Sequence, residues 1–259
     1  MPPCPTRRQF LPLLAGLPAM VMAGRAQAGA LVCGVLLSEP WVMQTGKEAG
    51  LGHDLVALLA REAGIAVTVL PAPQPRLMQA LQSRQIDLML FLQHRQLDEM
   101  AIGLVEVGQV DIGIMKARNF TPKGAADFVG RRVAHMRFGA APTSLPEGTI
   151  LVEVKDIHQG LAMLAAGRVD GCLGGNFGLE WQIRRYGFDR GLFGGFHLLR
   201  AEPLLFYAGA RVAADPDLAG RLKAAAPAVA AAFPGLCARY LAQAGPGVPQ
   251  APRLESQSN

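Results

Sequence analysis

The chain has 259 residues, of which 51% are hydrophobic and 17% are charged, and its formal net charge is +5. This composition is typical of a globular protein and excludes a chain that is disordered throughout. Three arginines lie in the N-terminal export segment described below, so the rest of the chain carries a charge of only about +2. The basic residues are scattered, without an aromatic platform among them, which argues against nucleic acid as a partner.

The N-terminus has the three parts of an export signal. The pair Arg7-Arg8 resembles a twin-arginine motif, Leu11–Gly24 is apolar, and Ala26-Gln27-Ala28 offers small residues to a signal peptidase. The apolar part has 14 residues with two prolines and two glycines, too short to span a bilayer of about 30 Å. We therefore expect residues 1–28 to be a twin-arginine signal peptide, cleaved after Ala28, and the protein to be periplasmic without membrane insertion.

Three cysteines remain after the export segment: Cys33, Cys172 and Cys237. An odd number cannot all pair internally, and their apolar neighbours favour buried thiols, although their redox state stays open. The sequence has no CxxC motif and no Cys/His spacing of the kind that binds zinc. We therefore expect neither a metal nor a cofactor.

Strand and helix patterns alternate in the first part of the remaining chain. Apolar runs predict buried strands, apolar stripes predict amphipathic helices, and Asp54 is expected to cap the first helix. In chain order the predicted elements are strand Leu31–Leu37, helix Asp54–Ala63, strand Ala66–Leu70, helix Pro75–Ser83 and strand Ile86–Phe91. This order indicates a parallel sheet covered by helices.

A further strand is followed by a second α/β unit. The predicted strands are Gln109–Lys116, Arg132–Met136, Ile150–Glu153, Val169–Leu173 and Leu204–Ala210, and the helices are Asp156–Ala166, Asn176–Tyr186, Asp215–Ala225 and Gly235–Gln243. Residues 245–259 are rich in proline and serine and are expected to form a disordered tail. Periodicity alone leaves two arrangements open: two independent domains, or two lobes joined by crossing strands.

Five short segments, in order, resemble the extracellular solute-binding proteins of family 3, which serve polar amino acid importers. They are Pro40-Trp41, Gly52-His53-Asp54-Leu55, Ala80–Asp87, Asp127–Ala134 and Leu161–Asp170. The resemblance implies an α/β fold, the two-lobed type II periplasmic binding protein with two hinge strands. Lobe 1 would comprise residues 29–116 and 204–244, and lobe 2 residues 117–203. The hinges would lie near Gly113–Arg118 and Pro203–Arg211.

In such a fold the ligand lies at the carboxyl ends of the strands, where four loops meet. Family members that bind amino acids carry hydroxyls and an arginine in the second loop, Gly-Ser/Thr in the third, and an aspartate in the fourth. Here the hydroxyls and the aspartate are missing, whereas arginines remain in the second and third loops. The candidate ligand-binding residues are Trp41 in the first loop, Gln93 and Arg95 in the second, Arg137 and Gly139 in the third, and Asn176 in the fourth.

Three of these candidates have a structural alternative. Trp41 could pack beneath a loop, Arg95 could be solvated, and Asn176 could cap a helix. Because no acid replaces the missing aspartate, the ammonium of a bound α-amino acid would be poorly paired. Burial of such an unpaired ion costs on the order of several kcal/mol. An organic anion or a neutral polar solute is therefore the expected ligand.

The resemblance implies a monomeric solute-binding protein that captures a small molecule, with an ABC permease as partner. One alternative is a binding protein that assists a periplasmic dehydrogenase or a signalling system. Another is a cyclohexadienyl-dehydratase-like enzyme, which needs a carboxyl general acid in the cleft. The nearest acids are Glu39, Asp54 and Glu180. Asp54 is expected to cap a helix and Glu180 lies a turn into one, so only Glu39 could reach the cleft. Since no GxSxG motif is present either, we expect a binding protein and keep the enzyme as the alternative.

Overall fold

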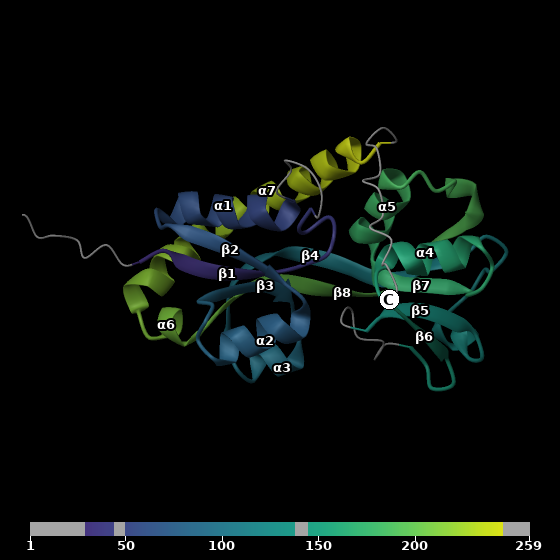
Figure 1. Ribbon diagram of the computed structural model, residues 1–259, viewed down its shortest axis with the longest axis horizontal. Helices are drawn as coiled ribbons and strands as arrows, with labels where there is room; N and C mark the ends of the chain where they lie inside the picture. The colour runs from purple at the N-terminus through teal and green to yellow at the C-terminus, as the bar shows by residue number, and fades with distance from the viewer. Residues whose placement is uncertain (1–28, 44–49, 138–144, 246–259) are drawn as a thin grey trace, which may run out of the picture.

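The computed structural model describes residues 29–43, 50–137 and 145–245. The predicted signal peptide, Gly139 and residues 246–259 of the predicted tail lie outside these ranges. Lobe 1 is built on three parallel strands and lobe 2 on three more, and two long strands connect them (Figure 1). The long strands are β4 (Ile102–Ala117) and β8 (Phe193–Ala208).

Lobe 1 contains β1 (Leu31–Leu36), α1 (Leu51–Ala63), β2 (Val67–Ala72), α2 (Gln74–Gln82), β3 (Leu88–Leu92), α3 (Arg95–Asp98), α6 (Ala210–Ala213) and α7 (Pro216–Gln243). Lobe 2 contains the 3-10 turn η1 (Ala125–Phe128), β5 (Arg132–Met136), β6 (Ile150–Val154), α4 (Ile157–Ala165), β7 (Gly171–Gly175), α5 (Asn176–Arg185) and the 3-10 turn η3 (Arg190–Leu192). The α/β alternation predicted from the sequence is thus present in both lobes.

The strands form one sheet in the order β2-β1-β3-β8-β4-β7-β5-β6. β4 and β8 are antiparallel to each other, β8 pairs with β3 through Leu204–Ala208, and β4 pairs with β7 through Ile112–Lys116. Residues 108–111 and 201–203, between these regions, are where the strands pass from one lobe to the other. This pairing confirms the predicted fold class, two lobes joined by two strands, and excludes two independent domains.

The first crossing lies a few residues before the expected hinge at Gly113–Arg118. Gly113 to Lys116 already pair with β7, because β7 extends the lobe 2 sheet back to Ile112. The predicted residue bounds of the lobes stay a prediction, since both long strands belong to both lobes.

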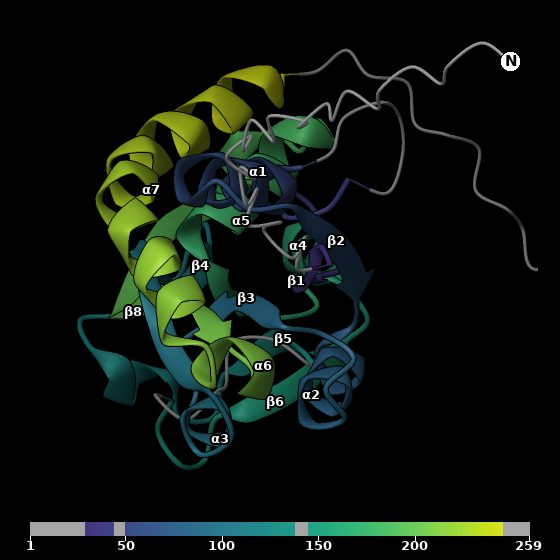
Figure 2. The same ribbon diagram turned by 90° about the vertical axis from the view of Figure 1, so that its left-hand side faces the viewer.

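Side chains of β1 alternate between two helical layers, as expected for a strand with two buried faces. Leu31, Cys33 and Val35 belong to the cluster that includes α1 and α7, whereas Val32 and Leu36 pack against the cluster around α2. Figure 2 shows α1 and α7 side by side on one face of the sheet, with α2 on the other.

Two predictions for the helices were wrong. Asp54 does not cap α1, which begins at Leu51 after Gly50; its carboxylate instead accepts hydrogen bonds from Arg239 and, at 2.9 Å, from the Tyr240 hydroxyl. The two closing helices are one helix, α7, which continues through Pro227 and Pro234. Packing explains the second difference, because buried α7 residues on both sides of each proline hold the helix against α1 and β4.

By length and composition alone, α7 would be long and apolar enough to cross a membrane. In this fold it is a covering helix. Leu222, Val229, Phe233 and Tyr240 are buried in the main core cluster, and Arg221 donates at 3.0 Å to the carbonyl oxygen of Ala63 at the end of α1.

Candidate functional site

The segment after β1 places Trp41 between the lobes. The N–H groups of Leu51 and Gly52 donate to the carbonyl oxygens of Pro40 and Trp41, both at 2.9 Å. A Cβ at Gly52 would lie 2.5 Å from Val35 Cγ1 and 2.9 Å from the Trp41 oxygen, so the close approach requires glycine. Because the first N–H groups of a helix have no partner inside it, these bonds replace a side-chain cap and fix the Trp41 backbone.

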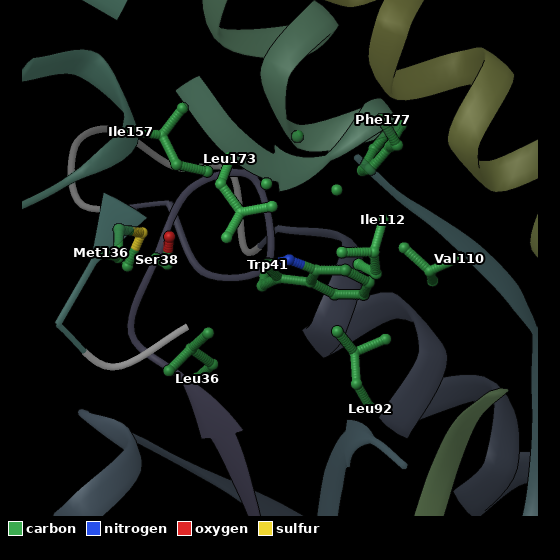
Figure 3. Close-up of a pocket in the computed structure, with 13 residues that line it drawn as sticks. Leu36, Ser38, Trp41, Leu92, Val110, Ile112, Met136, Ile157, Leu173 and Phe177 are labelled. Atoms are coloured by element: carbon green, nitrogen blue, oxygen red, sulfur yellow. The ribbon is translucent and has the colours of Figure 1, made fainter. Parts of the chain in front are cut away.

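An apolar cavity of about 80 Å³ lies between the lobes, at the carboxyl ends of β1, β3, β5 and β7 (Figure 3). This is the position expected for a ligand in an α/β sheet. Among the described residues, the cavity is lined by Leu36, Ser38, Trp41, Leu92, Val110, Ile112, Met136, Ile157, Leu173, Gly174, Gly175, Phe177 and Gly178. Both lobes and the crossing strand β4 contribute, so closure of the lobes would change its shape.

A second apolar cavity of about 60 Å³ extends into lobe 1. It shares Leu36, Trp41 and Leu92 with the first, and the other described residues that line it are Val35, Leu90, Phe91 and Leu204. Figure 3 shows the indole of Trp41 at the centre of the site, with Leu92 on one side and Leu173 and Phe177 on the other. Trp41 therefore lines both inner cavities, and its role in ligand binding stays a prediction.

The polar part of the site is a wider cavity of about 450 Å³, which shares Leu36 and Met136 with the inner one. Arg137, Glu153, Lys155 and Gln74 are its polar lining residues. Arg137 Nε donates to Glu153 Oε1 at 2.6 Å, and this hydrogen bond lowers the pKa of the Glu153 carboxyl below its usual value. An arginine thus stands at the outer end of an apolar cleft.

The polar side chains of the loop after β3 do not line the described cavities. The Arg95 side chain is 93% exposed and forms an ion pair with Glu99 at 3.1 Å on α3, and Gln93 is exposed. Neither lines the described cavities. Buried Tyr207 holds this loop, because its hydroxyl donates to Asp98 at 2.9 Å and accepts from the His94 N–H at 3.3 Å. Roles for Arg95 and Gln93 in a ligand-bound form stay predictions.

The loop after β7 brings an aromatic residue to the site. Asn176 is the first residue of α5, and the N-cap position before it is occupied by Gly175. Its neighbours Gly175 and Phe177 line the cavity, and the Phe177 ring meets Trp41 edge to face, with centroids 6.3 Å apart and planes at 72°. Gly139, the remaining candidate, lies outside the described residues.

The three acids considered for catalysis are engaged in structural contacts. Glu39 is 8% exposed and accepts a hydrogen bond from the Tyr186 hydroxyl at 2.5 Å. Asp54 joins α1 to α7, as described above, and Glu180 pairs with Arg190 at 3.0 Å. None of the three lines the described cavities. Within the described ranges, no group of three His, Cys, Asp or Glu side chains could hold a metal ion.

Most of the residues that line the cleft were not among the candidates predicted from the sequence. Leu92, Met136 and Phe177 line the cleft, and each lies directly next to a polar candidate in the sequence. Leu92 and Met136 lie at the end of a predicted strand, and Phe177 lies at the start of the helix that follows one, so position was the signal.

No family model and no curated protein sequence matches the chain, whereas solved structures do. The ligand-binding core of GluR0 with L-glutamate is 14% identical, with a TM-score of 0.69 and coverage of 83% of this chain and 99% of that one. A mutant of ArgBP from T. maritima is 16% identical, with a TM-score of 0.66 and coverage of 83% and 96%. A histidine kinase sensor domain similar to periplasmic binding proteins is 21% identical, with a TM-score of 0.66 and coverage of 84% and 98%.

At these identities the likeness concerns the fold alone. Together with the strand order, it assigns the chain to the two-lobed fold of type II periplasmic binding proteins. The structural neighbours named above are ligand-binding proteins or sensor domains.

Proposed function

We propose that this protein is an exported solute-binding protein that closes its lobes on a small organic solute and delivers it to an ABC importer. The observation that carries the proposal is the cleft itself, which lies at the carboxyl ends of strands from both lobes and is lined by both. The proposed export rests on the N-terminal sequence; N-terminal sequencing of the periplasmic protein should then begin at Gly29.

The proposed ligand is an organic anion. Arg137 lines the outer cavity, and no acid is among the described residues that line the two inner cavities. A carboxylate can replace Glu153 as a partner of Arg137 when the lobes close, because a guanidinium binds carboxylates through paired hydrogen bonds. An ammonium group would find no acid among the described residues of the inner cavities, and Glu153 is the one acid in the described lining of the outer cavity.

Calorimetry with matched pairs, such as succinate and aspartate, tests this proposal. We expect the carboxylate without an α-amino group to bind more tightly, and to raise the unfolding midpoint of the protein more. Arg137→Ala should weaken carboxylate binding by roughly 1.5–3 kcal/mol, the usual value for a charge-assisted hydrogen bond. Arg95→Ala is the matched control, since Arg95 is also paired with a glutamate but lies outside the described cavities.

Small-angle scattering would follow closure directly, because saturating ligand should lower the radius of gyration. Tight binding of lysine that Arg137→Ala leaves unchanged would contradict the anion assignment. A larger loss of affinity in Arg95→Ala than in Arg137→Ala would indicate that the anion binds at the loop after β3 instead.

A role as a sensor is the second candidate, because the structural neighbours include a histidine kinase sensor domain and BvgS domains of Bordetella pertussis. Deletion of the gene separates the two roles. Import requires that uptake of labelled ligand falls, whereas sensing requires that uptake persists while the transcriptional response to the ligand is lost. An enzymatic role is not part of the proposal, since Glu39, Asp54 and Glu180 all face structural partners.

A further inference from the structure

The two inner cavities have little polar chemistry. Among the described side chains that line them, the Ser38 hydroxyl and the Trp41 indole N–H are the only polar groups. A polar solute seated there would exchange its hydrogen bonds to water for hydrocarbon contacts, which is unfavourable. An apolar group seated there would gain from leaving water. The inner cleft therefore favours an apolar part of the ligand.

The size of this space limits what can enter. The cavities have volumes of about 80 and 60 Å³ and adjoin at Leu36, Trp41 and Leu92. Each is smaller than the volume of about 150 Å³ at which an apolar protein cavity accommodates benzene. A group the size of a phenyl ring therefore needs the two spaces to join beside Trp41, as a shift of that side chain on ligand binding would allow.

The shape of the space is set by two aromatic rings from different lobes. Trp41 follows β1 in lobe 1 and Phe177 lies in the first turn of α5 in lobe 2, and their rings meet edge to face. Both side chains are partly exposed, so a ligand can reach them. A flat group seated beside these two rings contacts both lobes at once and stabilises the closed form.

We infer that the protein selects organic anions with a flat apolar group, which inserts beside Trp41 and Phe177 while the carboxylate faces Arg137. This ligand class rests on the proposed function and narrows it. The outer cavity, which holds Arg137, shares Leu36 and Met136 with the inner one, so a single molecule can occupy both. The selection thereby departs from that of proteins that bind small polar amino acids.

Titration of the purified protein with 3-phenylpropionate, propionate and succinate tests the inference, because these probes share a carboxylate and differ in the rest of the molecule. We expect 3-phenylpropionate to bind roughly tenfold to a hundredfold more tightly than propionate, from burial of the phenyl group and its contacts with the two rings. Intrinsic fluorescence reports the contact. The chain has two tryptophans, and the second, Trp181, is 2% exposed and serves as an internal reference.

Variants separate the aromatic site from general effects on folding. Trp41→Ala should abolish the preference for 3-phenylpropionate, whereas Trp41→Phe should keep most of it. Phe120→Leu is the control, since Phe120 packs on Phe128 and does not line the cavities. Thermal melts by circular dichroism identify any variant whose loss of binding reflects unfolding.

Three outcomes distinguish failure of this inference from failure of the proposed solute-binding function. Equal affinity for the three carboxylates, with lobe closure, would overturn the aromatic selection and leave the proposed function standing. A preference that survives Trp41→Ala would overturn the assigned position. Failure of every carboxylate to bind or to compact the protein would overturn both.

Discussion

Glu39 and Tyr186 form a hydrogen bond that joins the two lobes. Glu39 follows β1 in lobe 1, Tyr186 ends α5 in lobe 2, and the tyrosine hydroxyl donates to the buried carboxylate at 2.5 Å. Gln182 of α5 donates to the backbone oxygen of Glu39 at 3.5 Å. Burial and the carboxylate raise the pKa of Tyr186 above its usual range, so the phenol remains a donor at neutral pH.

Tyr186→Phe should lower the free energy of unfolding by about 1–3 kcal/mol, because it removes a donor from a buried carboxylate but keeps the ring. The ring contact with His158, with centroids 4.4 Å apart, is retained in this variant. Urea unfolding followed by fluorescence measures the change. Glu39→Gln and the double variant complete a cycle, and a coupling energy near zero would contradict the bond.

At the residue scale, the sequence indicated some of the residues that line the cavities but not the apolar character of the lining. Trp41 and Arg137 do line the cavities, but the hydrocarbon side chains around them were not predicted. Leu92, Met136 and Ile157 look like ordinary core residues in the sequence. Only the distant pairing of β4 with β7 and β8 determines that such residues face a cleft instead of a core.

At the element scale, most strands and helices were predictable because their patterns are local. The errors arose where a distant partner decides the outcome. Asp54 looks like a helix cap in isolation, yet Arg239 and Tyr240 of α7 engage its carboxylate. The late strand was predicted as Leu204–Ala210, whereas β8 begins at Phe193, since pairing along β4 extends it.

Gly113 shows how tightly β4 and β8 approach each other. The register shifts between Ile112 and Gly113, which pair with Arg200 and Leu198. A Cβ at Gly113 would collide with the backbone oxygen of His197 and lie 2.6 Å from Phe196 Cζ. Backbone cannot yield as a flexible side chain does, so this position requires glycine.

Gly113→Ala should therefore lower the free energy of unfolding by roughly 1–3 kcal/mol, the usual range for overpacking. Gly103→Ala, in the same strand, is the matched control. Its Cβ would lie 3.3 Å from Leu205 Cδ1, a side chain that can shift. Urea unfolding should show a loss below about 1 kcal/mol for the control, and an equal loss in both variants would contradict the argument.

At the scale of the whole molecule, the sequence could not choose between two domains and two lobes, because the choice depends on β4 pairing with β8, two strands that lie on either side of lobe 2 in the sequence. The same long-range order appears in the three tyrosines of the sequence. Tyr186 donates to Glu39, Tyr207 to Asp98 and Tyr240 to Asp54, each across more than 100 residues. All three hydroxyls therefore depend on the complete tertiary fold.

This arrangement makes the stability of the whole fold sensitive to alkaline pH. Burial, followed by the hydrogen bond to a carboxylate, raises the pKa of Tyr240 to about 12, and the same causes raise the pKa values of Tyr186 and Tyr207 above their usual range. In the unfolded chain the phenols titrate near about pH 10. Above that pH the unfolded state binds fewer protons than the folded state, so the free energy of unfolding falls as pH rises.

Urea unfolding between pH 7 and 11 should show a tyrosine contribution that is constant below about pH 10 and is lost above it. The slope for each tyrosine is at most about 1.4 kcal/mol per pH unit, and less for Tyr186, which solvent partly screens. Buried thiols also lower the free energy of unfolding as pH rises, and they begin to do so at a lower pH than the tyrosines. Burial raises the pKa of Cys172, for example, to about 12. Tyr240→Phe should lower stability at pH 7 but flatten the alkaline decline, because one of the raised groups is gone. An equally steep decline in that variant would show that the tyrosine–carboxylate bonds do not set the alkaline limit of the fold.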